Sequence, residues 1–164
     1  MKNTVLDLSH EYLSELEKTQ QIIAALPDDK KGWKPHTKSM SLGELASHVV
    51  ELQTWFNNAI VENVYDFQTD YKPLEFDNFS HLNTILAQGV KRNLEAMNQK
   101  EKEFWLEEFT FKKGTYVITK LPRIAFIRSV LTNHFIHHRG QLSVYLRLLD
   151  IPVPGIYGPS ADEN

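Results

Sequence analysis

The chain contains no cysteine. This absence excludes disulfide bonds, thiolate metal ligands and a cysteine nucleophile. A site for a soft or borderline metal ion would therefore have to use histidine, carboxylate or water ligands. The sequence supplies 7 histidines for that purpose.

Long runs of one kind of residue are also missing. The chain has 18 lysines and arginines against 21 acidic residues, and its formal net charge is -3. No stretch is strongly basic, which argues against a nucleic-acid partner bound through its phosphates. No apolar run approaches the roughly 20 residues that a membrane-spanning helix needs. We therefore expect neither a nucleic-acid nor a membrane partner.

The N-terminal segment lacks the apolar stretch of a signal peptide, because Asp7, His10, Glu11 and Glu15 interrupt it. We therefore expect a cytoplasmic protein. Two common motifs are absent as well: the sequence has no G-x-S-x-G nucleophile elbow and no glycine-rich phosphate loop.

Apolar residues recur at helical spacing in four stretches of the chain, at about 4–26, 42–60, 78–100 and 121–149. A long connection at about 65–77 separates the second stretch from the third. Residues 104–119 alternate like a strand or hairpin, with a turn at 113–114. We predict an all-α fold, a four-helix bundle with a long crossover connection and a short hairpin before the last helix. We expect one domain over residues 1–164.

The second stretch has a clear start and carries a histidine on its apolar side. Ser41 and Glu44 have the spacing of a capping box, in which each residue's side chain bonds the other's backbone N–H. His48 follows Leu45 by three residues and precedes Leu52 by four, so it lies on the apolar stripe of this helix.

The fourth stretch carries two more histidines on one face. His134 and His138 are four residues apart, and residues at that spacing are neighbours on a helix surface. At about 100° per residue, both fall within an arc of about 60° that is otherwise apolar. The apolar members of that arc are Ile127, Leu131, Leu142 and Tyr145. His137 also lies near this face, but the i+4 geometry favours His138.

Two imidazoles on one helix and a third on a facing helix would form a three-histidine metal site with open positions for water or substrate. The competing interpretation is that each histidine packs in the core with a satisfied hydrogen bond. Three histidines on apolar stripes are harder to explain in that way, since each buried imidazole needs a partner. His10, His36 and His81 lack such a context, and we expect them at the surface.

Polar residues near the three histidines have several interpretations. Gln141 follows His138 by three residues and could orient a ligand or a bound water. Glu44 and Glu51 lie about one turn on either side of His48 and could contact it or carry protons. The favoured interpretation is that Glu44 serves only the capping box and that Glu51 is solvated. We expect Arg139 to point away, toward the surface or a subunit contact.

Three passages together resemble the DinB/YfiT-like superfamily of metal-binding four-helix bundles, the DNA-damage-inducible family. Residues 41–48 (SLGELASH) are similar to its second-helix motif, with His48 as first ligand. Residues 134–141 (HFIHHRGQ) match its H-x-x-x-H-R-G-Q signature, with His134 and His138 as the other ligands. Residues 152–160 (PVPGIYGPS) resemble the tail that often follows. The similarity covers essentially the whole chain, and all three ligand positions are filled.

The resemblance implies a divalent metal such as zinc, nickel or manganese, a pocket for a small-molecule substrate, and a homodimer. Related members include thiol transferases that use bacillithiol or mycothiol and a mycothiol-dependent maleylpyruvate isomerase. We therefore expect a metal-dependent S-transferase that activates a low-molecular-weight thiol, although no catalytic residue beyond the metal ligands can be assigned. The alternatives are a hydrolase that uses metal-bound hydroxide and a non-catalytic, stress-linked protein that binds a metal or a small ligand.

Overall fold

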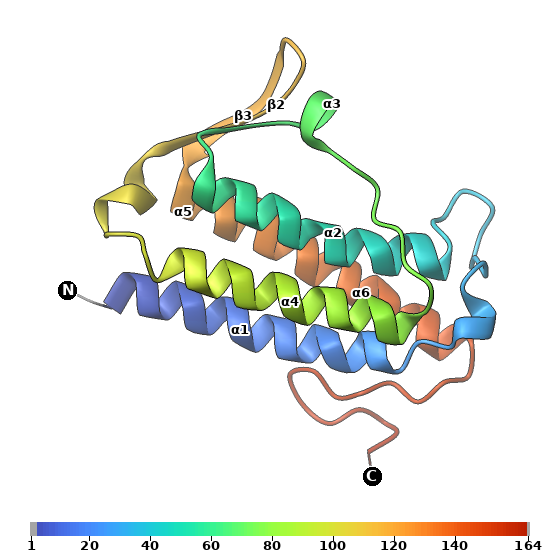
Figure 1. Cartoon of the computed structure of the whole chain (residues 1–164). Coiled ribbons are helices and arrows are strands. Elements are labelled where there is room, and N and C mark those ends of the chain that lie inside the picture. Colours follow the sequence, from blue (N-terminus) through green and yellow to red (C-terminus); the bar gives the residue numbers. More distant parts are fainter. Residues whose placement is uncertain (1–2, 164) are drawn as a thin grey trace.

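The computed structural model describes residues 3–163, with side chains described from residue 8 onward. Four long helical segments lie side by side (Figure 1). They are α1 (Asn3–Ala24), α2 (Leu42–Val61), α4 (Phe79–Met97) and a last segment that ends in α6 (Asn133–Leu148). The predicted four-helix bundle is confirmed. No helix in the described part of the chain has the length and apolar character needed to cross a membrane.

Capping residues explain where two of these helices begin. The Ser41 hydroxyl accepts a hydrogen bond from the Glu44 backbone N–H at 3.2 Å. The Glu44 carboxylate accepts one from the Ser41 N–H at 2.7 Å, so the predicted capping box is present. Asn78 caps α4 by accepting a hydrogen bond from the His81 N–H at 2.8 Å. These caps fix the register of α2 and α4, and with it the face that each helix turns to the core.

The apolar stripes of the helices meet in one core. Gly89 on α4 permits a close approach to α2, because a Cβ atom at that position would lie only 3.1 Å from Cβ of Gln53. Leu16 and Ile23 on α1 are buried as their spacing predicts, and so is Leu26 just beyond the end of this helix. Leu13 is not buried, with 37% of its surface exposed. The Leu6 side chain, which belongs to the same predicted stripe, lies outside the described residues.

The last helical segment is not a uniform α-helix. It begins with α5 (Arg123–Phe126), continues through a π-helical segment, η3 (Ile127–Thr132), and ends in α6. A π-helix turns more slowly than an α-helix, so the segment shifts the face that α6 presents. Ile127, Leu131, Leu142 and Tyr145 are nevertheless buried, in agreement with the predicted stripe.

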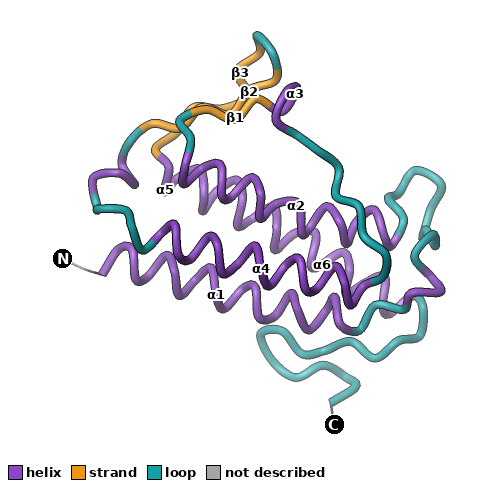
Figure 2. Tube along the Cα trace, viewed as in Figure 1, coloured by secondary structure: helices purple, strands orange, loops and turns teal. Residues whose placement is uncertain are grey.

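A small sheet lies at one end of the bundle (Figure 2). The predicted hairpin is present as β2 (Glu108–Lys113) and β3 (Tyr116–Pro122), joined by a turn in which Gly114 has a φ of 59°. The sequence pattern did not predict a third strand, β1 (Val64–Asp66), which pairs with β2 in parallel, or the short helix α3 (Phe67–Asp70). Both fall in the connection that we expected to be a loop. A strand of three residues is too short to show an alternating pattern.

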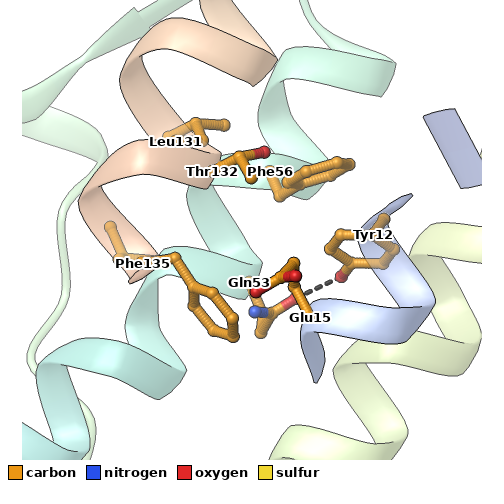
Figure 3. Close-up of a pocket in the computed structure, with 8 residues that line it drawn as sticks. Tyr12, Glu15, Gln53, Phe56, Leu131, Thr132 and Phe135 are labelled. Atoms are coloured by element: carbon orange, nitrogen blue, oxygen red, sulfur yellow. Dashed lines mark hydrogen bonds between the residues drawn. The ribbon is translucent and has the colours of Figure 1, made fainter. Parts of the chain in front are cut away.

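A buried polar network ties α1, α2 and α4 together in the core. The Tyr12 hydroxyl donates a hydrogen bond to the Gln53 side-chain carbonyl (Figure 3). It accepts one from the Asn93 amide at 2.7 Å. Burial raises the pKa of Tyr12, so this phenol stays protonated at neutral pH. The cavity beside it measures only about 10 Å³, which is room for about one water molecule and not for a ligand.

Candidate metal centre

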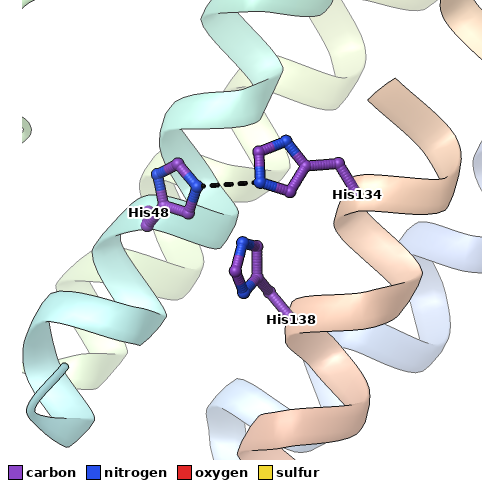
Figure 4. A group of neighbouring side chains, drawn as sticks. All are labelled: His48, His134 and His138. Atoms are coloured by element: carbon purple, nitrogen blue, oxygen red, sulfur yellow. Dashed lines mark hydrogen bonds between the residues drawn. The ribbon is translucent and has the colours of Figure 1, made fainter. Parts of the chain in front are cut away.

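Three histidines converge between α2 and α6 (Figure 4). His48 comes from α2, and His134 and His138 come from successive turns of α6. The Nε2 atoms of His48 and His134 are 3.3 Å apart, and one ligand atom from each of the three residues lies within 4.8 Å of the others. The structure thus brings together all three histidines that the sequence analysis selected, in a group that could hold a metal ion. Within the described chain, no fourth histidine, aspartate or glutamate belongs to this group.

A buried carboxylate supports the first of these imidazoles. Glu51 is only 7% exposed, and its Oε2 atom lies 3.4 Å from Nδ1 of His48. The same carboxylate accepts hydrogen bonds from the Tyr71 hydroxyl at 3.1 Å and from the Leu74 backbone N–H at 2.8 Å. The expectation that Glu51 is solvated was therefore wrong. Its spacing from His48 was visible in the sequence, but the segment that covers it comes from the distant crossover connection.

These contacts decide which nitrogen of His48 is free. Burial opposes ionisation of Glu51, but the hydrogen bonds from His48, Leu74 and Tyr71 hold its pKa below the usual range. An ionised carboxylate only accepts hydrogen bonds, so Nδ1 of His48 carries the proton. The lone pair is then on Nε2, the atom that faces His134. This is the arrangement in which a carboxylate orients a metal-ligating histidine.

Gln141 makes the corresponding contact with His138. Its Oε1 atom lies 2.7 Å from Nδ1 of His138, across one turn of α6. The amide oxygen is an acceptor, so Nδ1 donates and Nε2 is left with its lone pair. The spacing of Gln141 from His138 predicted that it faces this site, and the contact agrees with that prediction. Gln141 is exposed, so its hydrogen bond is weaker support than the buried one at His48.

The surroundings keep the α6 imidazoles neutral. Burial, together with the smaller effect of the neighbouring histidines, lowers the pKa of His134 to about 4. Burial also lowers the pKa of His138, although the Gln141 contact opposes the shift. Both rings are therefore unprotonated at pH 7, which is the form that binds a metal ion. The donor set fits a divalent cation that accepts imidazole ligands.

An aromatic side chain that the sequence analysis did not select covers one side of the histidine group. The ring centroid of Trp55 lies 5.9 Å from that of His48 and 6.0 Å from that of His134, with both pairs edge to face. Trp55 is 7% exposed and also contacts Phe67 and Tyr71 near the crossover. It shields the two imidazoles from water on that side. Its helical spacing of seven residues from His48 was the available signal.

The other candidate residues from the sequence lie outside the group of three histidines. His137 is exposed, with its ring centroid 4.9 Å from that of His138, and it is not part of the close group. The Glu44 carboxylate is 59% exposed and lies 3.2 Å from Nζ of Lys34, in addition to its capping contact. The remaining histidines are exposed as expected: His10, His36 and His81.

Arg139 does not point to the surface, and that expectation was wrong. It is 2% exposed and forms an ion pair with Glu15 on α1 at 2.6 Å. It also donates to the Glu15 carbonyl at 2.8 Å and to the Tyr157 hydroxyl at 2.6 Å. The arginine of the H-R-G-Q passage therefore joins α6 to α1 and to the C-terminal tail. Its contacts fix the position of α6 in the bundle.

A cavity of about 590 Å³ reaches His48 and Glu51 from outside. Lys34 and Lys38 line it, together with hydroxyl groups of the segment before α2. Its volume lies within the range of small-molecule sites. Glu44 and Glu51 line it as well, and Lys34 is paired with Glu44, so a bound molecule would meet charges of both signs.

The fold and the site define a class: a bundle of four helices with three converging imidazoles and an adjoining cavity. The chain belongs to the DinB family, whose family model matches residues 1–164. It is similar to the uncharacterised protein YrdA of Bacillus subtilis (strain 168), with 26% identity over 91% of this chain and 85% of that protein. It is also similar to YjoA of the same organism, with 28% identity over 85% of this chain and 86% of the relative.

Solved structures share the fold. The crystal structure of the DinB-like protein YjoA from Bacillus subtilis superposes with a TM-score of 0.74 and 24% identity, over 94% of this chain and 99% of that one. A DinB-like protein from Bacillus cereus ATCC 10987 gives a TM-score of 0.70 and 20% identity, over 90% and 94% of the two chains. At these identities the likeness supports the bundle architecture alone.

Proposed function

We propose that this chain, as a single DinB-like domain over residues 1–164, binds one divalent metal ion through His48, His134 and His138. The ion would be zinc, nickel or manganese. The observation that supports the proposal is the approach of three ligand atoms to within 4.8 Å without a fourth protein ligand in the described residues. Structural metal sites are closed by four protein ligands, whereas catalytic sites keep a position open.

We further propose that the protein is an S-transferase that activates a low-molecular-weight thiol of the bacillithiol type. A divalent ion held by neutral ligands keeps its full charge and lowers the pKa of a thiol. The thiol sulfur would form the new bond to an electrophilic carbon of a second small molecule. The leaving group departs with its bonding electrons, and the thiol proton passes to solvent.

The protein residues have separate parts in this proposal. Glu51 and Gln141 hold the imidazoles of His48 and His138 in the tautomer with Nε2 free. Trp55 excludes water from one side of the group. Lys38 lines the cavity that leads to His48 and would attract an anionic group of a thiol or substrate, whereas Lys34 is paired with Glu44.

A hydrolase is the alternative at the same site, because the ion would also lower the pKa of water. A hydrolase needs a general base within reach of that water. Glu51 is the buried carboxylate beside the group, and both of its oxygens already accept hydrogen bonds from His48, Tyr71 and Leu74. This favours transfer of a thiol over hydrolysis. The adjoining cavity favours an enzyme over a protein that only sequesters metal.

Metal content of the untagged protein tests the site. We expect about one ion per chain in the wild type and loss of the ion in His48→Ala, His134→Ala and His138→Ala. His137→Ala is the matched control, because it removes an exposed imidazole next to His138. Wild-type protein that takes up no zinc, nickel or manganese would overturn the site. Equal loss in the control variant would show that the assay reports unspecific binding.

Binding of thiols tests the activity. The nickel- or cobalt-loaded protein is titrated with bacillithiol and with its S-methylated form, and the sulfur-to-metal charge-transfer band is followed. We expect the band with the free thiol alone. Turnover is then measured with 1-chloro-2,4-dinitrobenzene, which releases chloride as the thioether forms. A loaded protein that shows no band and no turnover, but cleaves an ester panel, would replace the transferase by the hydrolase.

We also propose a homodimer. Val144 and Leu148 are four residues apart on α6, and they are 55% and 57% exposed. Two apolar side chains on one exposed face favour burial against a partner. Sedimentation equilibrium of the wild type beside a Val144→Lys, Leu148→Lys variant checks the proposal: we expect twice the chain mass for the former and the chain mass for the latter.

A further inference from the structure

A second cavity lies across Glu51 from the histidine group. It measures about 370 Å³ and is enclosed by α2, α4 and the crossover that connects them, drawn in green in Figure 1. Its volume lies within the range of small-molecule sites. Its lining includes none of the three converging histidines of the described chain. The cavity is therefore separate from the three histidines, although Trp55 contacts both, and it shares with the cavity at His48 the wall formed by Glu51, Tyr71, Pro73 and Leu74.

Aromatic and aliphatic side chains form the walls. Trp55 lies 5.8 Å from Tyr65 and 6.4 Å from Tyr71 between ring centroids, and the second pair meets edge to face. Leu74 and Ile85 add aliphatic surface from the crossover and from α4. Such walls suit a flat ring or a short acyl chain.

One polar group in this lining has no partner. Tyr65 is only 2% exposed, and its hydroxyl forms no hydrogen bond to any residue of the described chain. Burial raises the pKa of Tyr65 to about 12, and the charges of Asp70 and Glu51 act in the same direction. The phenol therefore stays protonated and can donate. Buried hydroxyl groups are almost always satisfied, so this one is available to donate to a water molecule or to a molecule that occupies the cavity.

The acidic and the basic side chains of the lining differ in whether they have partners. Both acids are already engaged: Glu51 in the contacts given above, and Asp70 as acceptor from the Asp66 N–H at 2.8 Å and the Thr69 hydroxyl at 2.7 Å. The two cations of the lining, Lys72 and Arg92, form no ion pair within the described residues. The lining thus carries two negative and two positive charges, and only the two cations, which are both exposed, are free to turn toward a negatively charged acceptor.

We propose that this cavity binds a small organic carboxylate with an aromatic or short acyl body. The carboxylate accepts the Tyr65 hydrogen bond and faces Lys72 and Arg92, and the apolar body packs against Trp55. The site does not depend on the metal ion or on the proposed transferase.

Titration of the full chain after chelator treatment tests the site without the metal. The probes are benzoate, phenylacetate and hexanoate, with phenylacetamide as the uncharged comparison, followed by ligand-observed NMR and calorimetry. We expect at least one carboxylate to bind one site per chain with a millimolar dissociation constant, and the amide to bind more weakly. Binding that persists after the metal has been removed would also show that the carboxylate is not coordinated by the metal ion.

Three variants locate the binding. Tyr65→Phe removes one unpaired hydroxyl and should weaken carboxylate binding about tenfold. Arg92→Gln should weaken it too, whereas Lys91→Gln, which removes the neighbouring charge on the same helix outside the lining, should not. Gln88→Trp fills the cavity from an exposed position of α4 and should abolish binding. Absence of binding for all three carboxylates, or equal binding in Tyr65→Phe and Gln88→Trp, overturns the proposal and leaves the metal site untouched.

Discussion

Nδ1 of His48 lies 3.4 Å from Oε2 of Glu51, across one turn of α2. The same carboxylate is hydrogen-bonded to Tyr71 and Leu74, which belong to the crossover connection. The orientation of one candidate ligand is therefore set by a residue that also holds the crossover against α2. Glu51 thus contacts the metal centre and also lines both adjoining cavities.

Replacement of Glu51 by glutamine should weaken metal binding. An amide can no longer supply the negative charge that fixes the proton on Nδ1 of His48. Loss of such a partner typically lowers metal affinity about 10- to 100-fold. The measurement is competition with a chelating dye. Glu44→Gln is the control, because that carboxylate is exposed and bonded to Ser41 and Lys34. Equal affinities of wild type and Glu51→Gln would show that the carboxylate does not orient the ligand.

Gln141→Ala should have a smaller effect in the same direction. The 2.7 Å contact with His138 is lost, but water can replace an exposed amide. We expect a decrease in metal affinity of severalfold at most, on the order of 1 kcal/mol. The same competition assay compares it with Gln99→Ala, an exposed glutamine beyond the end of α4. A larger effect than that of Glu51→Gln would reverse the order of importance that burial predicts.

Arg139→Gln should destabilise the fold strongly. The variant leaves the Glu15 carboxylate, whose side chain is 14% exposed, without its partner on α6. Breaking a buried pair costs about 3–5 kcal/mol when the remaining charge has no other partner, and we expect the lower end here because Lys18 and Tyr157 still bond Glu15. The comparison is Arg128→Gln. It removes an exposed ion pair with Glu11, which lies on α1 as Glu15 does, and it should cost at most about 1 kcal/mol. Urea unfolding of the two variants measures the difference, and similar free energies of unfolding would contradict it.

Stability should depend on the ionisation of Glu15 in acid. Burial opposes ionisation, but hydrogen bonds from Tyr157, Arg139 and Lys18 hold the pKa of Glu15 below its ordinary value of 4.5. The folded state therefore binds this proton less readily than the unfolded state. The stabilisation is complete above pH 4.5 and is lost as the pH falls through the folded pKa.

The matched comparison for this effect is Glu15→Gln, which carries no charge at any pH. We expect it to be less stable than the wild type at pH 7, and the gap in the free energy of unfolding to narrow as the pH is lowered below 4.5. Urea unfolding at a series of pH values gives both curves. A gap that stays constant from neutral to acid pH would show that Glu15 contributes by shape and not by charge.

The sequence alone determined the features that depend on near neighbours along the chain. The capping box of Ser41 and Glu44, the helical stripes and the spacing of His134 and His138 all follow from the period of the α-helix. His48 lies on the apolar stripe of its helix, so the sequence placed it toward the core, and the apolar arc of the last helix placed His134 and His138 there as well. These rules sufficed for the four-helix bundle and for the selection of three converging histidines.

Only the tertiary structure decided what these side chains contact. The burial of Glu51 depends on Tyr71 and Leu74, which are 20 and 23 residues further along the chain. The burial of Arg139 depends on Glu15, which is 124 residues away. The strand β1 forms only because β2 offers it a partner. Periodicity describes which face a residue occupies, but pairings over such distances are set by how whole helices and the crossover pack together, and no local pattern records them.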